Sequence, residues 1–257
     1  MSHALHDTHP RAAIIKFYSA YKQPILTEEY YRLLTPVLSC AKSTNATVRS
    51  GAIRLFRAIS QGVSGVPDSK PTVELILAPS LGGKSNGADH RQALYSMLES
   101  IPTTPTTSRD LVQKMLPLME KETSEMVLIT QSELVPRHLA YLLQDEGEPT
   151  FDPSIAAIIV KDLSSAKSTS RKAMTMTVGQ TFWYISQSDA AWSPTADRLF
   201  QDLQQALEKI LSEAQTISNS VATGPIEVWV ALTVLLCACQ KSAYGKRYLP
   251  SNSVAYP

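Results

Sequence analysis

The sequence predicts an all-α protein made of about five helical hairpins stacked side by side, and three observations lead to this expectation. Apolar residues recur at a spacing of three to four along most of the 257 residues. The alternating pattern that is typical of strands is scarce. Helix starts recur near residues 28, 71, 110, 153 and 195, and each is followed by a second helix.

The interval between these starts indicates the type of repeat. Successive first helices begin about 39 to 43 residues apart, close to the range of about 40 to 47 residues that is typical of HEAT repeats. We therefore predict an α-solenoid of HEAT-like hairpins, an armadillo-like superhelix, over residues 11–244. Residues 1–10 and 245–257 are expected to be disordered tails. The apolar last helix lacks the polar cap of a solenoid end, so we expect the chain to be a fragment or truncated product of a longer array.

The first hairpin is read from "EEYYRLLTPVLS" and "NATVRSGAIRLFRAIS". Asn45 and Thr47 are the two candidates for the cap of its second helix. Pro36 lies inside the first helix, and Pro117 lies at the corresponding place in "MLPLME". Proline removes a helical hydrogen bond, so both residues are predicted to kink their helices along the outer face of the array.

The later hairpins follow from similar signals. Asp89 is expected to cap "HRQALYSMLES", after the Gly- and Ser-rich loop "SLGGKSNGAD". "TADRLFQDLQQALEKILSEAQTI" carries one apolar stripe that includes Leu199 and Leu203. "IEVWVALTVLLCAC", residues 226–239, is shorter than the roughly 20 residues of a membrane helix, so it is expected to be a buried helix.

An arginine stands at the start of two predicted second helices, Arg49 in "TVRSGAIRLF" and Arg171 in "STSRKAMTMTVGQTFW". A cation at this end opposes the helix dipole and needs a carboxylate or carbonyl partner. Each arginine is followed by a small residue, Ala52 or Ala173, which lets neighbouring helices approach. HEAT repeats resemble this pattern, in which arginines stack in a ladder along the inner ridge. We expect Arg49 and Arg171 to form such a structural ladder.

Composition limits the function. The net charge is +1, so no global field attracts the chain to nucleic acid or membrane. The chain has three cysteines, Cys40, Cys237 and Cys239. This odd number and their spacing suit neither a set of disulfides nor a zinc site, so they indicate a reducing compartment. The N-terminus has no signal-peptide pattern. These features predict a cytoplasmic protein.

No motif supports catalysis. "GGKS" at residues 82–85 lacks the first glycine of a phosphate-binding loop. His3, His6 and His9 share a helical spacing but lie in the expected tail. His90 and His138 are far from the cysteines, and no nucleophile motif surrounds any serine. We predict that the chain is not an enzyme and has no cofactor, metal site or small-molecule substrate.

The best local basic patch is "KDLSSAKSTSRK" at an expected inter-helix turn. This segment has one acidic residue, Asp162, and four basic residues: Lys161, Lys167, Arg171 and Lys172. This set is the candidate contact for the RNA backbone of a ribosome, and the alternative is a solvated turn. The aromatic residues of "TFWYI", residues 181–185, are expected to belong to the core rather than to a stacking platform.

Four strings carry a resemblance to a known family: "LLTPVLSCAKSTNATVRSGAIRLFRAI", "DHRQALYSMLESIP", "LPLMEKETSE" and "AAWSPTADRLF". They resemble the N-terminal part of the general-control translational activators, large HEAT-repeat proteins that ride on ribosomes. The resemblance runs from about Glu28 to Tyr244.

The resemblance implies a non-enzymatic scaffold segment that binds the ribosome and stimulates the kinase of initiation factor two alpha in amino-acid starvation. It implies contact with other proteins through the solenoid surface. The kinase and the ATP-binding-cassette partner are expected to bind only through regions that this chain lacks. The alternative is a generic HEAT or armadillo interaction adaptor with no role on the ribosome.

Overall fold

The computed structural model describes residues 27–62, 69–78, 86–144, 153–163, 165, 167–187 and 192–216, and it describes the backbone alone at residues 153, 207 and 210–216. Within these ranges the chain forms nine α-helices and no strand. It divides into two compact units, Met1–Pro102 and Thr103–Pro257. The prediction of an all-α, solenoid-type fold is therefore confirmed for the described part of the chain.

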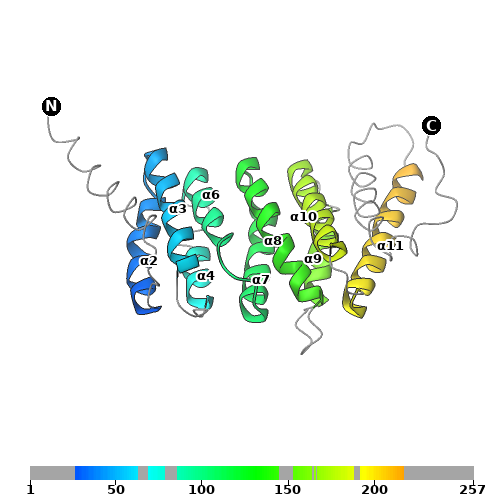
Figure 1. Cartoon of the computed structure of the whole chain (residues 1–257). Helices are drawn as coiled ribbons and strands as arrows, with labels where there is room; N and C mark the ends of the chain where they lie inside the picture. The colour runs from blue at the N-terminus through cyan, green and yellow to red at the C-terminus, as the bar shows by residue number, and fades with distance from the viewer. Residues whose placement is uncertain are drawn as a thin grey trace. The chain divides into compact units, whose positions relative to one another are not determined.

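Unit 1 contains two helical hairpins. The first is formed by α2 (Thr27–Ala41) and α3 (Ala46–Gly62), and the second by α4 (Lys70–Leu77) and α6 (Ala88–Leu98). Helix α6 packs on both α2 and α3, so the second hairpin stacks on the first (Figure 1). Buried apolar side chains from all four helices, including Phe56, Ile76 and Leu94, form the core of this unit.

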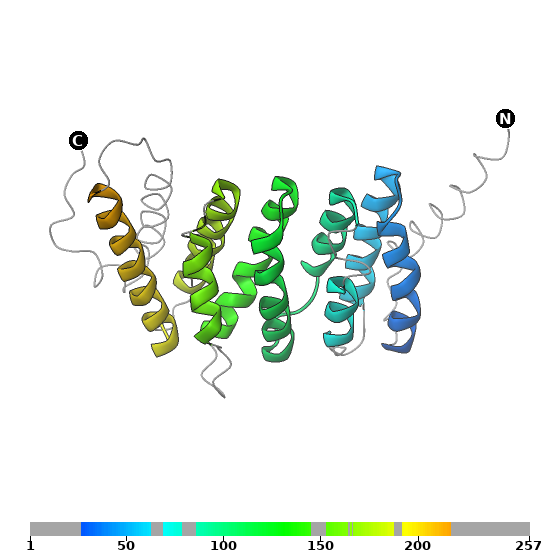
Figure 2. The same ribbon diagram turned by 180° about the vertical axis from the view of Figure 1, so that it is seen from behind.

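Unit 2 repeats this arrangement. One hairpin is formed by α7 (Pro105–Lys121) and α8 (Glu125–Gln144), and the next by α9 (Pro153–Leu163) and α10 (Ser168–Ser186). First helices pack together, as α7 and α9 do, and second helices pack together, as α8 and α10 do. Helix α11 (Pro194–Thr216) packs on α8 and α9. The view from behind shows the same succession of helices (Figure 2).

An aromatic cluster joins α10 to α11. The rings of Phe182, Trp192 and Phe200 lie with their centroids 5.2 to 5.6 Å apart, and two of the three pairs meet edge to face. All three residues are buried. The predicted stripe of α11 also turns inward, because Leu199 and Leu203 are buried. Aromatic and apolar burial therefore fixes α11 against the preceding hairpin.

Local capping sets two helix starts. The Asn45 side chain accepts hydrogen bonds from the backbone amides of Thr47 and Val48 at 2.8 and 3.4 Å, so Asn45, rather than Thr47, caps α3. Thr104 caps α7 by accepting from the Thr107 amide at 3.2 Å, and Pro105 follows as the first helical residue. The expectation that Asp89 caps α6 is wrong: Gly87 holds the cap position, and Asp89 lies in the first turn.

The two predicted kink residues lie inside first helices, Pro36 in α2 and Pro117 in α7, and both helices continue past them. Pro36 is exposed and Pro117 is half-buried. A third proline, Pro136, lies buried inside α8 and was not predicted. The kinks themselves stay a prediction.

Several expectations concern residues outside the described ranges. These are the two tails, the histidines of the N-terminus, the "GGKS" segment and the apolar stretch at residues 226–239. Among the helices that are described, none combines the length and the apolar character needed to cross a membrane.

Candidate functional site

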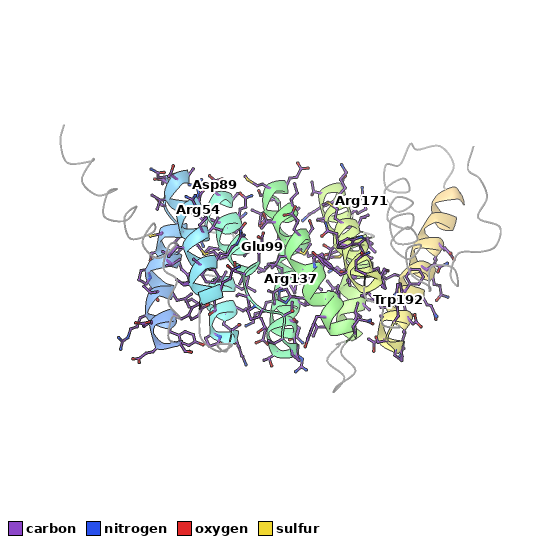
Figure 3. All side chains as sticks on the ribbon, in the orientation of Figure 1. Arg54, Asp89, Glu99, Arg137, Arg171 and Trp192 are labelled. Atoms are coloured by element: carbon purple, nitrogen blue, oxygen red, sulfur yellow. The ribbon has the colours of Figure 1, made fainter. Side chains whose placement is uncertain are left out.

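Side-chain contacts between successive hairpins recur at a fixed distance in the sequence. Arg49 pairs with Asp89, Arg57 with Glu99, and Lys161 with Glu120, and the partners are 40, 42 and 41 residues apart. The Tyr30 and Thr72 hydroxyls, 42 residues apart, lie at 3.3 Å. Figure 3 labels two of the acidic partners, Asp89 in the first turn of α6 and Glu99 directly after the last residue of α6. Equivalent helices therefore interact through polar side chains one repeat apart.

Arg49 has both kinds of partner that the helix dipole requires. Its Nη1 donates to the carbonyl oxygens of Ser43 and Thr44, each at 2.9 Å. Its Nη2 lies 2.8 Å from Asp89 Oδ2 on α6, and the arginine side chain is only 15% exposed. The single guanidinium thus closes the turn before α3 and joins α3 to the next hairpin.

The same position is occupied by arginine in three second helices. Arg49, Arg91 and Arg171 are each the fourth residue of their helices, α3, α6 and α10. Each donates from Nη1 to a carbonyl of the preceding turn, at Ser43, Asn86 and Ser165 respectively. Arg91 and Arg171 are buried. These bonds stabilise the hairpin turns, and whether they act as a ladder stays a prediction.

Arg91 was not predicted, although the sequence carries a signal for it. It follows Arg49 by one repeat and precedes Arg171 by two. Helix α8 breaks the series, because its fourth residue is the buried Leu128. The turn before α8 is closed by Glu122 instead, whose Oε1 accepts from the amides of Thr123 and Ser124 at 2.8 and 2.9 Å.

The structure places the four predicted basic residues around the turn from α9 to α10, but in different environments. Lys161, Lys167 and Lys172 are exposed, whereas Arg171 is buried and points back to Ser165. Figure 3 labels Arg171, near the start of α10. Only the three lysines are therefore available to a ligand.

Lys161 is engaged by a carboxylate of α7. Its Nζ lies 2.5 Å from Glu120 Oε1. This hydrogen bond raises the pKa of Lys161 and lowers the pKa of Glu120. The pair neutralises one end of the patch, so Lys167 and Lys172 carry most of its positive charge.

Asp162 lies beneath this patch and is buried. Burial raises the pKa of its carboxyl to about 6, and the nearby Glu120 charge adds to the shift, while Lys161 and Lys167 oppose it. The only acidic residue of the predicted patch therefore stays mostly ionised at pH 7 and becomes neutral as the pH falls below about 6.

A buried polar pair joins α7 to α8. His138 Nδ1 lies 3.0 Å from Ser108 Oγ, and Arg137 Nε donates to His138 Nε2 at 3.3 Å. Because Nε2 accepts, the ring proton lies on Nδ1, which donates to Ser108. A nucleophilic serine needs the opposite arrangement, with the ring nitrogen accepting its proton. Both side chains have no exposed surface, so the pair is suited to holding the two helices together.

Burial also governs the charge of His138. It lowers the pKa of the imidazole to about 3, and the charge of Arg137 contributes. The ring is therefore neutral at physiological pH. No pattern in the sequence indicates this pair, because the two residues are 30 positions apart. Within the described residues, no three His, Cys, Asp or Glu side chains come together as a metal site would require.

The expectation for the aromatic run on α10 is wrong in part. Phe182 and Ile185 belong to the core, but Trp183 and Tyr184 are each 41% exposed. Their rings meet edge to face with centroids 5.2 Å apart. A continuous aromatic run cannot lie on one side of a helix, so part of it faces solvent.

Stacked hairpins that are joined by polar side-chain contacts one repeat apart define a helical-repeat scaffold. The model of one family, described as General control nonderepressible 1 (Gcn1) N-terminal, matches residues 88–254. The chain belongs to the Gcn1 N-terminal family, as the resemblance in the sequence indicates.

Comparison with individual proteins adds little. No curated protein matches the chain. Among solved structures, the chain is similar to a designed armadillo repeat protein in complex with the peptide (KR)4, with 14% identity and a TM-score of 0.41. That match covers 88% of this chain and 92% of the designed protein. At this level of similarity, it says nothing about what the chain binds.

Proposed function

We propose that the chain is a non-enzymatic scaffold segment of a translational activator and that it contacts the ribosome through the α9–α10 turn. The observation that supports this proposal is the family match together with the exposed lysines at that turn. As part of the activator, the segment would hold ribosome and protein partners in place for stimulation of the initiation factor two alpha kinase in starvation. Such work takes place in the cytoplasm.

The chemistry of the turn is suited to a phosphate backbone. Lys167 at the cap position before α10 and Lys172 near the start of α10 present two ammonium groups, and the buried Arg171 donates a hydrogen bond to the turn. Each phosphate that a lysine neutralises releases a condensed counterion, so affinity falls as salt rises. Lys161 contributes less, because Glu120 already pairs with it.

The test is co-sedimentation of the folded chain with ribosomes across a salt series from about 50 to 200 mM. Salt-sensitive pelleting is expected. Lys167→Glu with Lys172→Glu should weaken pelleting and flatten its salt dependence. The matched control is Arg54→Glu with Lys209→Glu, which makes the same charge change at exposed positions of α3 and α11. An equal loss of pelleting in both double variants would mean that the overall charge of the chain, rather than this turn, determines binding. No pelleting of the wild type at low salt would favour the generic interaction adaptor.

A further inference from the structure

The large apolar side chains that remain exposed are confined to two helices. Within the described residues, six such side chains are 37% to 44% exposed, and all lie on α8 or α10: Met126, Ile129, Tyr141, Met176, Trp183 and Tyr184. Unit 1 has none among its described residues. Single exposed apolar residues need no explanation, but a cluster on neighbouring elements marks an interaction site.

The six side chains form two parallel stripes. On α8, Met126, Ile129 and Tyr141 follow helical spacing and lie in one line with Glu133 and Arg137. On α10, Met176, Trp183 and Tyr184 share a face with Lys172 and Gln180. The opposite faces of both helices are in the core.

The two stripes lie side by side, because α8 packs directly against α10 (Figure 1). Residues of the two stripes also occupy the same positions when counted from the start of each helix. Ile129 and Lys172 are the fifth residues of α8 and α10, and Tyr141 and Tyr184 are the seventeenth. We call these six apolar residues with their two helices the α8–α10 face. It extends from Met126 to Tyr141 on α8, a length of about 22 Å at 1.5 Å per residue.

The charges on the face indicate the class of partner. The exposed charged residues of these two helices are Glu125 and Glu133 on α8 and Lys172 on α10. Arg137 is half-buried, with its Nε directed at His138. A nucleic acid or an anionic membrane requires an excess of positive charge, which this face lacks. Tyr, Trp and Met are the residues enriched in protein interfaces, and Tyr and Trp contribute most to binding hot spots.

We propose that the α8–α10 face binds an amphipathic helix of a partner protein. The partner helix carries an apolar stripe of about four turns, which is the length of the face. It places a basic residue against Glu133 and an acidic residue against Lys172, about one helical turn apart. This interaction goes beyond the contact with the ribosome, and it depends on different side chains except for Lys172.

A displayed library of helical peptides of about 18 residues provides the probe. One library has apolar residues at helical spacing and random charges between them, and the control library has the same composition without the stripe. Peptides that bind the intact chain are expected only from the first library. Selected peptides should lose at least about tenfold in affinity with Ile129→Ser or Trp183→Ser, and not with the control Gln113→Ser at an exposed site on α7.

The charges are tested by exchange. Glu133→Lys should weaken the selected peptides, and replacing their facing basic residue with glutamate should restore binding. Because Ile129, Trp183 and Glu133 lie outside the basic turn, their variants should still pellet with ribosomes, which separates this proposal from the first.

Three outcomes would overturn the proposal. The libraries could be enriched equally, or the selected peptides could ignore both apolar substitutions. The third is that something other than a helix binds the face. In that case Trp183→Ser would abolish either self-association of the chain, measured by sedimentation equilibrium, or binding of labelled single-stranded RNA. Circular dichroism of each variant establishes that it is folded.

Discussion

The Arg49 guanidinium on α3 lies 2.8 Å from the Asp89 carboxylate on α6, and the same guanidinium holds two carbonyl oxygens of the turn before α3. One side chain therefore stabilises a turn and a contact between hairpins. Asp89 benefits as well, since a carboxylate in the first turn of a helix interacts favourably with the dipole.

Arg49→Ala should destabilise unit 1. It removes three hydrogen bonds from a mostly buried group, and the expected loss is about 1 to 3 kcal/mol in the free energy of unfolding. Thermal or urea unfolding measures it. Arg32→Ala is the control, because its pair with Glu28 is 75% and 76% exposed and should contribute little. An unchanged melting temperature in Arg49→Ala would contradict the ladder assignment.

Asn45→Ala should destabilise α3 by about 1 kcal/mol, because the amides of Thr47 and Val48 lose their acceptor. The urea midpoint should fall with an unchanged slope. Thr47→Ala serves as the control, since Asn45 holds the cap position. A larger effect in Thr47→Ala than in Asn45→Ala would show that the cap is assigned to the wrong residue.

The buried His138 should make unit 2 sensitive to acid. Its folded pKa of about 3 lies below the ordinary value of 6.5, so the unfolded chain binds the proton more readily. Stability is therefore complete above pH 6.5 and falls as the pH drops toward 3. The expected loss between pH 6.5 and 5 is about 2 kcal/mol, at about 1.4 kcal/mol per pH unit.

The measurement is urea unfolding between pH 5 and 7 for the wild type and for His138→Gln. The variant can be less stable overall, but its stability should vary less with pH. Identical slopes for the wild type and His138→Gln would show that His138 does not titrate as its burial indicates.

Asp162 should contribute with the opposite sign. Its folded pKa of about 6 is above the ordinary value of 3.8, so the native state binds the proton more readily. Its contribution to stability is greatest below pH 3.8 and is lost as the pH rises through 6. Asp162→Asn should therefore raise the free energy of unfolding at pH 7.5, by on the order of 1 to 3 kcal/mol.

The gain from Asp162→Asn should shrink as the pH is lowered toward 4, which unfolding at several pH values would detect. Asp202→Asn is the control, because that carboxylate is 55% exposed on α11. Destabilisation by Asp162→Asn at pH 7.5 would mean that the ionised carboxylate has a favourable partner in the native state.

The sequence by itself determined the helices, since helical spacing and caps are local properties. The stripe with Leu199 and Leu203 was readable because α11 buries one side only. Asn45 was one of two candidate caps, and the choice required the geometry of the turn. Arg49 was recognised as needing a carboxylate or carbonyl, because a cation at a helix start is unfavourable without one.

Only the tertiary structure decided which partner each side chain takes. Arg171 was predicted as both a ladder residue and an RNA contact, and its burial makes it unavailable to a ligand. Trp183 faces solvent although its neighbour Phe182 is in the core. Ser108 meets His138 across two helices that no motif relates. Local pattern limits the face on which a residue can lie, but burial and pairing depend on how the helices pack, which involves residues distant in the sequence.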